Sequence, residues 1–474
     1  MTKLHSVMKV NKAMLVSLLF SLIIANISNA QNSTVFVEYG TTVHMGRNTP
    51  LWQISNQHGL SSIKNNTYIR GGTFYKNTIN SWTLEGCLDL AIAAGFTSTF
   101  IAQQAYIDVR HKWIGMWAGN RELTTELLNS QLSTGGLVWS SNARPIPQIC
   151  IGVLDYVHLT PGIQIKAQVS YGWFTDGQYQ KKYASKDFPY VKKTKFHHKS
   201  IYFRFGQSEK HWLFDAGIRI DDQFGGYATR GIHEGDLGNG WKDYLNALIP
   251  RNGGEGEYFD GNYLGSEHLK LTYQNKSIQL SIYLENYYDD FSGMGKQNGM
   301  DGLWGIEYKT NKRQAINNLV LEYYQSTNQS GALHGLDFSD VGKTGGADDY
   351  YNHVLYPGWS HWGMSMGNPL VASPIYNNNG NLAFQYNRVK AIHLGWSGDI
   401  SNEWTYRAKL SFNRTWGTPF KPIPEILENF STFAEFKYIP NKWKGWSFTA
   451  SAAFDIGDIY GDNLGLQLKV HKKF

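Results

Sequence analysis

Two stretches of the sequence place tryptophan rings beside planar polar side chains. The first contains Trp139, Asn142 and Arg144, and the second contains Trp359 and Trp362. An aromatic face suits the apolar side of a pyranose ring, while amide and guanidinium groups suit its hydroxyls. We therefore predict that these side chains form a carbohydrate-binding surface. For Arg144 and the prolines beside it, the alternative is that they only fix a loop.

A basic segment between Thr175 and Lys199 adds an electrostatic element to this surface. It carries seven lysines against two aspartates: Lys181, Lys182, Lys186, Lys192, Lys193, Lys195 and Lys199, with Asp176 and Asp187. Such a patch attracts uronic acids, or equally the phosphates of lipopolysaccharide, by long-range electrostatics. A plain solvated loop is the third interpretation. We predict glycan contacts for Lys192, Lys193 and Lys195, and we add Trp173, just before the segment, to the aromatic candidates.

One short run has the pattern of a catalytic serine. Residues Gly363 to Gly367 match the nucleophile elbow of hydrolases, with Ser365 in the nucleophile's place. That elbow requires a strand before the serine and a helix after it. The flanking residues have the character of a loop and end in Asn368 and Pro369, so we interpret the match as chance and predict that the protein is not an enzyme.

Acidic and histidine residues gather at Asp348, Asp349 and His353, with His361 further along the chain. Extracellular loops can hold Ca²⁺ through such carboxylates. No EF-hand or zinc spacing occurs here, so we expect a solvated loop and no metal or other cofactor. His197 and His198 are likewise expected to begin a strand.

The elements that position these residues begin after an export signal. Lys3, Lys9 and Lys12 precede an apolar run from Ala13 to Ile27, and small residues follow it up to Ala30. We predict a signal peptide at residues 1–30 and a mature domain at residues 31–474. The first mature residue is not Cys, so a lipid anchor lacks its acceptor.

The mature chain can cross a membrane only as a β-barrel. Beyond Ile27 no apolar run reaches the roughly 20 residues that a membrane helix needs, and the mean hydropathy is negative. The final residues, Asp462 to Phe474, instead alternate between apolar and polar side chains and end on an aromatic ring. This pattern is typical of the closing strand of an outer-membrane barrel, which the barrel-assembly machinery recognises.

The same period of two recurs along the chain and predicts an all-β fold, a transmembrane antiparallel β-barrel of about 18 strands. From Ile163 onward, short connectors alternate with long ones, and 414–429 is among the long ones. Short periplasmic turns and long extracellular loops produce this alternation. We also predict short helices within connectors at Arg121 to Leu132 and Trp241 to Leu248.

The side chains expected to face the lumen mix both signs of charge: Glu85, Asp89, Asp108, Arg110, Lys166, Arg204, Asp215, Arg219, Glu285, Arg407, Lys409, Glu435 and Lys437. Opposite charges at close quarters pair across the interior and fill it. This favours a narrowed or plugged barrel, although porins also carry opposed rows of charge.

Charge and cysteine content narrow the possible partners. Loss of the three signal lysines takes the formal charge from +6 to +3, too small a value to indicate a nucleic-acid partner. Cys87 and Cys150 could pair in an oxidising periplasm or remain free. An apolar outward row on nearly every strand predicts a monomer surrounded by lipid.

Between Thr49 and Ser200 the sequence resembles a known family. The runs that carry the resemblance are Thr-Pro-Leu-Trp at 49–52, Gly-Asn-Arg-Glu at 119–122, Leu-Ser-Thr-Gly-Gly-Leu at 132–137, Ser-Asn-Ala-Arg-Pro-Ile-Pro at 141–147, Tyr-Gly-Trp-Phe at 171–174 and His-His-Lys-Ser at 197–200. In these runs the chain is similar to the capsule assembly Wzi-like outer-membrane proteins. The later strands match that family in pattern only.

The resemblance implies an 18-stranded barrel, narrowed from within, whose outer loops bind capsular polysaccharide and hold it at the cell surface. The best-known members close the periplasmic end with a helical bundle that precedes the barrel. Here a strand-like segment starts at Val35, which leaves Leu51 to Lys64 or Arg121 to Leu132 to take that role. The resemblance therefore favours a lectin-like capsule protein, and the alternative is a porin for sugars or small anions.

Overall fold

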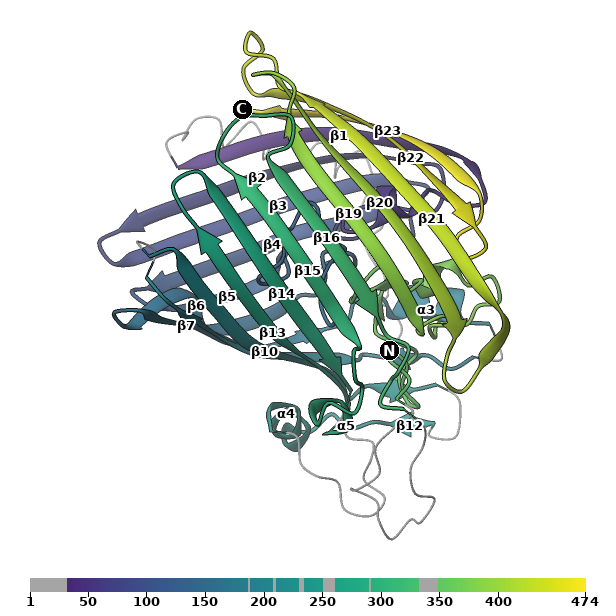
Figure 1. Ribbon diagram of the computed structural model, residues 1–474. Coiled ribbons are helices and arrows are strands. Elements are labelled where there is room, and N and C mark those ends of the chain that lie inside the picture. Colours follow the sequence, from purple (N-terminus) through teal and green to yellow (C-terminus); the bar gives the residue numbers. More distant parts are fainter. Residues whose placement is uncertain are drawn as a thin grey trace, which may run out of the picture.

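Eighteen antiparallel strands close into a barrel, which confirms the predicted fold class (Figure 1). This is a computed structural model, and it describes residues 32–474 except 186–187, 208–209, 230–233, 250–260, 290 and 332–347. The predicted signal peptide at residues 1–30 lies outside the described residues. Within the described part of the chain, no helix combines the length and hydropathy that a membrane crossing requires.

Each wall strand pairs with the next one along the chain, and β1 pairs with β23 to close the barrel. The wall strands are β1 (Ser33–Gly46), β2 (Asn66–Ile79), β3 (Trp82–Ala94), β4 (Phe100–His111), β5 (Ile114–Asn120), β6 (Gln148–Thr160), β7 (Ile163–Trp173), β9 (Lys195–Phe205), β10 (Trp212–Phe224), β13 (Asn262–Gln274), β14 (Ile278–Tyr288), β15 (Gly302–Thr310), β16 (Asn318–Gln325), β19 (Val389–Asp399), β20 (Trp404–Gly417), β21 (Pro422–Tyr438), β22 (Trp446–Gly457) and β23 (Asn463–Lys473).

Alternation of side chains explains why these segments form a wall. In β23, Leu464, Leu466 and Leu468 are exposed, whereas Asn463, Gly465 and Gln467, which alternate with them, are buried. An apolar outer surface around a polar inner one is the arrangement that a barrel needs in lipid. The outward row therefore faces the hydrocarbon, and the buried face lines the lumen.

Shorter elements lie in the connectors. They are the helices α2 (Leu51–Ile54), α3 (Gly177–Tyr183), α4 (Trp241–Leu248) and α5 (Phe291–Met294), the 3₁₀ helix η2 (Pro374–Tyr376), the small sheet of β8 (Val191–Lys192), β11 (Tyr227–Ala228) and β12 (Gly235–Asp236), and the hairpin of β17 (Ser360–His361) and β18 (Met364–Ser365). The helix predicted at Trp241–Leu248 is confirmed as α4.

The two ends of the barrel differ in the length of their connectors. Helices α4 and α5 and strand β12 lie at the end opposite the C-terminus (Figure 1). Because long loops face outward in such barrels and short turns face the periplasm, we call this end the outer end. The N-terminus of β1 and the C-terminus of β23 then both lie at the periplasmic end.

Two predictions about connectors are wrong. Residues 121–132 form no helix, because Leu127 adopts a positive φ of 62° and the segment bonds to the barrel wall instead. The predicted long connector at 414–429 shrinks to residues 418–421, because β20 and β21 continue past the apolar band. Their outer parts carry polar side chains such as Glu425 and Glu428, so the outward apolar row that marks a strand is missing there.

Candidate functional site

Three connectors fold back into the barrel and fill much of its lumen. They are residues 47–65, 121–147 and the described part of 326–388, here called the plug. Their apolar side chains meet in the largest cluster of buried residues, which includes Trp52, Val138, Trp359 and Val371. Burial of each large apolar side chain contributes roughly 1.5–3 kcal/mol. The plug is therefore a packed core inside the barrel.

Carboxylates of the wall hold the backbone of the plug. Glu322 accepts hydrogen bonds from the Ser133 hydroxyl at 2.5 Å and from the Thr134 N–H at 2.7 Å. Glu285 accepts from the Leu137 N–H at 2.9 Å. A buried carboxylate is tolerated only when donors satisfy it, so these inward acids fix the position of the plug.

Several of the remaining inward charges form ion pairs, as the sequence predicts, whereas Lys409 and Lys437 form none among the described residues. Ion pairs join Arg204 to Asp215 at 2.7 Å and Arg407 to Glu435 at 2.7 Å. Arg121 contacts Glu85 at 3.1 Å, which brings a residue of the plug against the wall. The charges thus narrow the lumen further and do not form rows of free charge at these positions.

A polar cavity of about 590 Å³ lies beneath residues 126–132, near the periplasmic ends of the strands. Lys270, Glu307 and Asn318 are among the side chains that line it. The cavity shows that the plug occupies the outer and middle parts of the lumen and leaves a vestibule below.

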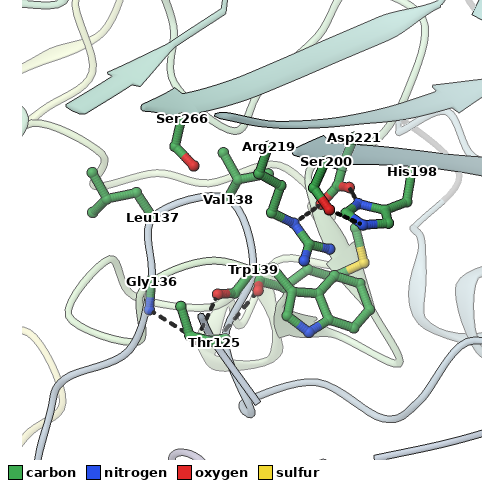
Figure 2. A network of polar contacts seen from close by, with 12 residues as sticks. Thr125, Gly136, Leu137, Val138, Trp139, His198, Ser200, Arg219, Asp221 and Ser266 are labelled. Atoms are coloured by element: carbon green, nitrogen blue, oxygen red, sulfur yellow. Dashed lines mark hydrogen bonds and ion pairs between the residues drawn. The ribbon is translucent and has the colours of Figure 1, made fainter. Parts of the chain in front are cut away.

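One predicted site residue, Trp139, belongs to a network between plug and wall (Figure 2). The Arg219 guanidinium lies over the Trp139 ring, with Cζ 4.9 Å from its centre. Asp221 accepts a bond from Arg219 Nε at 2.8 Å and contacts His198 Nδ1 at 2.5 Å. The network joins β9 and β10 to the plug through a cation–π contact.

The same network places Ser200, His198 and Asp221 in the order of a catalytic triad. Ser200 Oγ lies 3.1 Å from His198 Nε2. However, Gln168 Nε2 also lies 3.2 Å from that nitrogen, and Asp221 is shared with Arg219. A general base needs one ring nitrogen aimed at its nucleophile. The groups therefore satisfy one another as a buried ion-pair network.

Arg144 and Trp362 form a second contact near the outer end. Arg144 Cζ lies 4.5 Å from the centre of the Trp362 ring, and the guanidinium donates to Ser98 and Thr97 at 2.7 and 2.9 Å. Burial lowers the pKa of Arg144 to about 10, which leaves it charged at neutral pH. Trp362 is itself partly exposed and donates to the Thr175 hydroxyl.

The other aromatic and amide candidates are distributed between plug and wall. Asn142 and Trp359 are fully buried, and their side chains donate to the carbonyls of Ser365 and Val138 at 3.0 and 2.7 Å. Trp173 is the last residue of β7 and lies exposed in the outward row. Asn142 and Trp359 thus hold the plug together, while Trp173 lies at the rim of the wall.

The predicted lysines separate into exposed and buried groups. Lys192, the last residue of β8, and Lys193 after it are exposed. Helix α3 packs against β8 and carries the exposed Lys181 and Lys182. We call these four residues the lysine strip. Lys195 is buried in β9, with Nζ 4.6 Å from the Tyr244 ring centre.

Lys199 is not part of the lysine strip either. Its ammonium donates to the carbonyls of Ala247 and Leu248 at the end of α4. A cation at a helix C-terminus is favourable. Lys186 lies outside the described residues.

The residues considered for catalysis and metal binding have other partners. Ser365 is buried, and its hydroxyl accepts a bond from the Gly367 N–H at 3.2 Å. Asp348 accepts from Ser330, Asp349 accepts from Asn352 and Asn387, and His361 bonds to the Arg144 carbonyl. Among the described residues, no three His, Cys, Asp or Glu side chains gather as a metal site would require. Cys87 and Cys150 are both free thiols.

Comparison with known proteins bears on the fold. No family model matches the chain, and no curated protein matches its sequence. The structure is similar to that of Wzi from Escherichia coli, described as an outer membrane protein involved in group 1 capsule assembly and a carbohydrate-binding β-barrel. The identity is 13%, 96% of this chain and 87% of that chain are covered, and the TM-score is 0.55.

A second solved structure, OccK5 (OpdH) of Pseudomonas aeruginosa, is 8% identical, with 94% of this chain and 98% of that chain covered and a TM-score of 0.47. At such identities the similarity concerns the fold, which is that of an outer-membrane β-barrel.

Proposed function

We propose that this protein is a non-enzymatic, lectin-like protein of the outer membrane that binds capsular or another surface polysaccharide and retains it at the cell surface. The observation that carries the proposal is the plug. A packed core in the lumen leaves the outer face as the surface available for a polymer, and that face carries aromatic, amide and basic side chains. The similarity to Wzi and the local sequence resemblance support the same role.

The lysine strip supports an interaction with an acidic polymer. All four lysines of the strip are exposed, two on α3, one at the end of β8 and one directly after it. Lys192 Nζ also lies 5.7 Å from the ring centre of Tyr190. Exposed cations attract uronic acids at a range set by the salt concentration. Lipopolysaccharide phosphates are the competing partner for the same strip.

The proposal is tested by deletion of the gene followed by measurement of cell-bound and released polysaccharide. We expect more released and less cell-bound polymer in the deletion strain. Unchanged retention, together with no binding of the polymer by purified protein, would refute the proposal.

A matched pair of variants tests the lysine strip. Replacement of its four lysines by Gln should weaken binding of the purified acidic polymer several-fold at low salt. The control replaces Lys210, Lys276, Lys312 and Lys442, which are exposed at the periplasmic turns, and should leave binding unchanged. If both variants bind equally well, the strip has no part in recognition.

A passive channel for sugars or small anions is the second candidate, favoured by the polar vestibule of about 590 Å³. A channel needs a continuous water path past the plug. Liposome swelling in isotonic sugar solutions distinguishes the two functions: rapid swelling with the wild-type protein supports the channel, and none supports the plugged barrel.

Three further properties belong to the same proposal. The protein lies in the outer membrane as a monomer, because its outward row is apolar on strand after strand. β23, together with Phe474 directly after it, is the segment that the barrel-assembly machinery recognises. Binding and retention need no cofactor.

A further inference from the structure

A pocket of about 230 Å³ opens between three outer connectors that are far apart in the sequence. Arg47 comes from the connector after β1, Tyr376 and Tyr386 come from the plug, and Asp458 and Ile459 come from the connector before β23. None of the four lysines of the strip lines the pocket, although α3, which carries two of them, contacts the segment that holds Asn377. Its volume suits one or two sugar rings.

The floor and the rim of the pocket differ in polarity. Ile459 is buried at the floor, and Tyr376 packs there on Tyr460 with ring centres 5.1 Å apart. Arg47, Asn378 and Asp458 are exposed around it. An apolar, aromatic base with a polar rim matches the amphipathic faces of a pyranose ring.

Several hydrogen-bonding groups of the pocket have no partner in the described part of the protein. The Tyr376 hydroxyl is buried without one, and Arg47 and Asp458 take part in no side-chain ion pair among the described residues. Arg47 and Asp458 are exposed at the pocket, and a ligand rich in hydroxyls is the class of molecule that would bond to both.

The segment that carries the amides is held in place by its own bonds. The Asn377 side chain donates to the carbonyls of Asn381 and Ala383 at 2.7 and 2.8 Å. Tyr183 of α3 donates its hydroxyl to the Asn377 carbonyl. A binding loop fixed in this way loses little conformational entropy when a ligand enters.

We infer that this pocket binds a neutral hexopyranose unit of the glycan. The inference rests on the proposed function and assigns a sugar class and a location to it. Asp458 accepts bonds from two adjacent hydroxyls of the sugar, Arg47 donates to a ring or hydroxyl oxygen, and Tyr386 covers the apolar face. One cation and one anion balance at the rim, which favours an uncharged sugar over a uronic acid.

The test uses the full-length protein in detergent, with saturation-transfer NMR on glucose, galactose, mannose and glucuronic acid, and a binding titration with the purified surface polysaccharide. In the variant whose four strip lysines are replaced by Gln, we expect the neutral hexoses to bind better than glucuronic acid. Asp458→Asn and Tyr386→Ala should each weaken binding about tenfold or more. Glu425→Gln, an exposed carboxylate of β21 outside the pocket, is the control and should bind like wild type.

The outcomes separate this inference from the proposed function. If the wild-type protein binds the polysaccharide and both pocket variants bind it equally well, the pocket is not the site and the proposed function stands. If glucuronic acid binds better than every neutral hexose once the four lysines of the strip are replaced by Gln, the sugar class is wrong. If the wild-type protein binds no polysaccharide, the proposed function fails and the inference fails with it.

Discussion

The wall and the plug of this barrel are built on different principles. Wall strands repeat one pattern, apolar outside and polar inside, because every strand meets the same two environments. The plug has no period. Its segments are fixed by single contacts between residues hundreds of positions apart, such as the bond from the Leu51 N–H to Asp455 at 2.9 Å.

This difference separates folding from function. The wall is a closed cylinder whose position in the membrane does not depend on the conformation of the loops. The plug determines whether the lumen conducts, and its outer side is the surface where we propose that the glycan binds. Substitutions in the plug should therefore change hydrogen exchange, conductance or glycan binding while the barrel stays folded. Substitutions in the outward row should instead lower the stability of the barrel.

The largest effect is expected for Trp359→Ala. The change empties the centre of the plug and removes the bond from Nε1 to the Val138 carbonyl. We expect the plug to lose about 3–5 kcal/mol of stability. Hydrogen exchange of residues 121–147 should accelerate, while the heat-modifiable gel mobility of the barrel stays unchanged. Trp241→Ala, at an exposed ring on α4, is the control. If residues 121–147 are as well protected from hydrogen exchange in both variants as in the wild type, a packed plug is contradicted.

Leu466→Arg tests the wall in the same way. Leu466 lies in the outward row of β23, and an arginine in the hydrocarbon costs about 2–4 kcal/mol. Urea unfolding in lipid vesicles should show this loss. The same arginine at Asn402, in a periplasmic turn, should have little effect, and equal stability of the two variants would argue against the lipid-facing assignment.

Glu322→Ala breaks the contact between wall and plug. It leaves the Ser133 hydroxyl, the Thr134 N–H and the Tyr283 hydroxyl without their acceptor. We expect a loss of about 2 kcal/mol, read out as faster exchange at residues 132–137. Glu428→Ala removes an exposed partner of Arg414 and should cost less than about 1 kcal/mol. A larger loss of stability for Glu428→Ala than for Glu322→Ala would contradict the anchoring role of Glu322.

Acidification should loosen the outer part of the plug. Burial lowers the pKa of His353 to about 4, and its Nδ1 accepts a bond from the Leu355 N–H at 3.2 Å. The folded form therefore resists protonation more than the unfolded form. The stabilisation is complete above about pH 6.5 and is lost as the pH falls toward 4.

Hydrogen exchange of residues 349–388, corrected for intrinsic rates, should thus rise between pH 6.5 and 4. His353→Asn keeps an acceptor without the titration and should show a smaller rise. A flat profile in the wild type would exclude this coupling.

The wall could be predicted from the sequence because its signal is local. Rows such as Leu464, Leu466 and Leu468 give the face of each strand directly, and the count of strands is correct. The prediction of secondary structure failed for connectors, whose side chains meet the barrel interior and not lipid. Residues 121–132 have helical spacing of leucines, but bonds to Glu307 and other wall residues override that local preference.

The candidate site was predictable only in part. The pairing of Arg144 with Trp362 and the burial of Lys195 depend on which loops fold inward, and the sequence does not record this. The Arg219 and Asp221 network was missed, although inward positions of two neighbouring strands carry its residues. No signal in the sequence links Arg47, Tyr376 and Asp458, because they meet only when the barrel closes.

The last prediction is that no serine is labelled by a probe for catalytic serines. A fluorophosphonate probe should leave both Ser365 and Ser200 unmodified, because the first is buried and the second lies in a network shared with Arg219. Mass spectrometry of the treated protein checks this. A labelled serine at either position would call for a hydrolase function.

The most direct test of the account is the conductance of the purified wild-type protein in planar lipid bilayers. The plugged barrel predicts no steady, large single-channel currents for the wild type and their appearance in Trp359→Ala. Steady, large openings of the wild-type protein would contradict the plug and favour a porin.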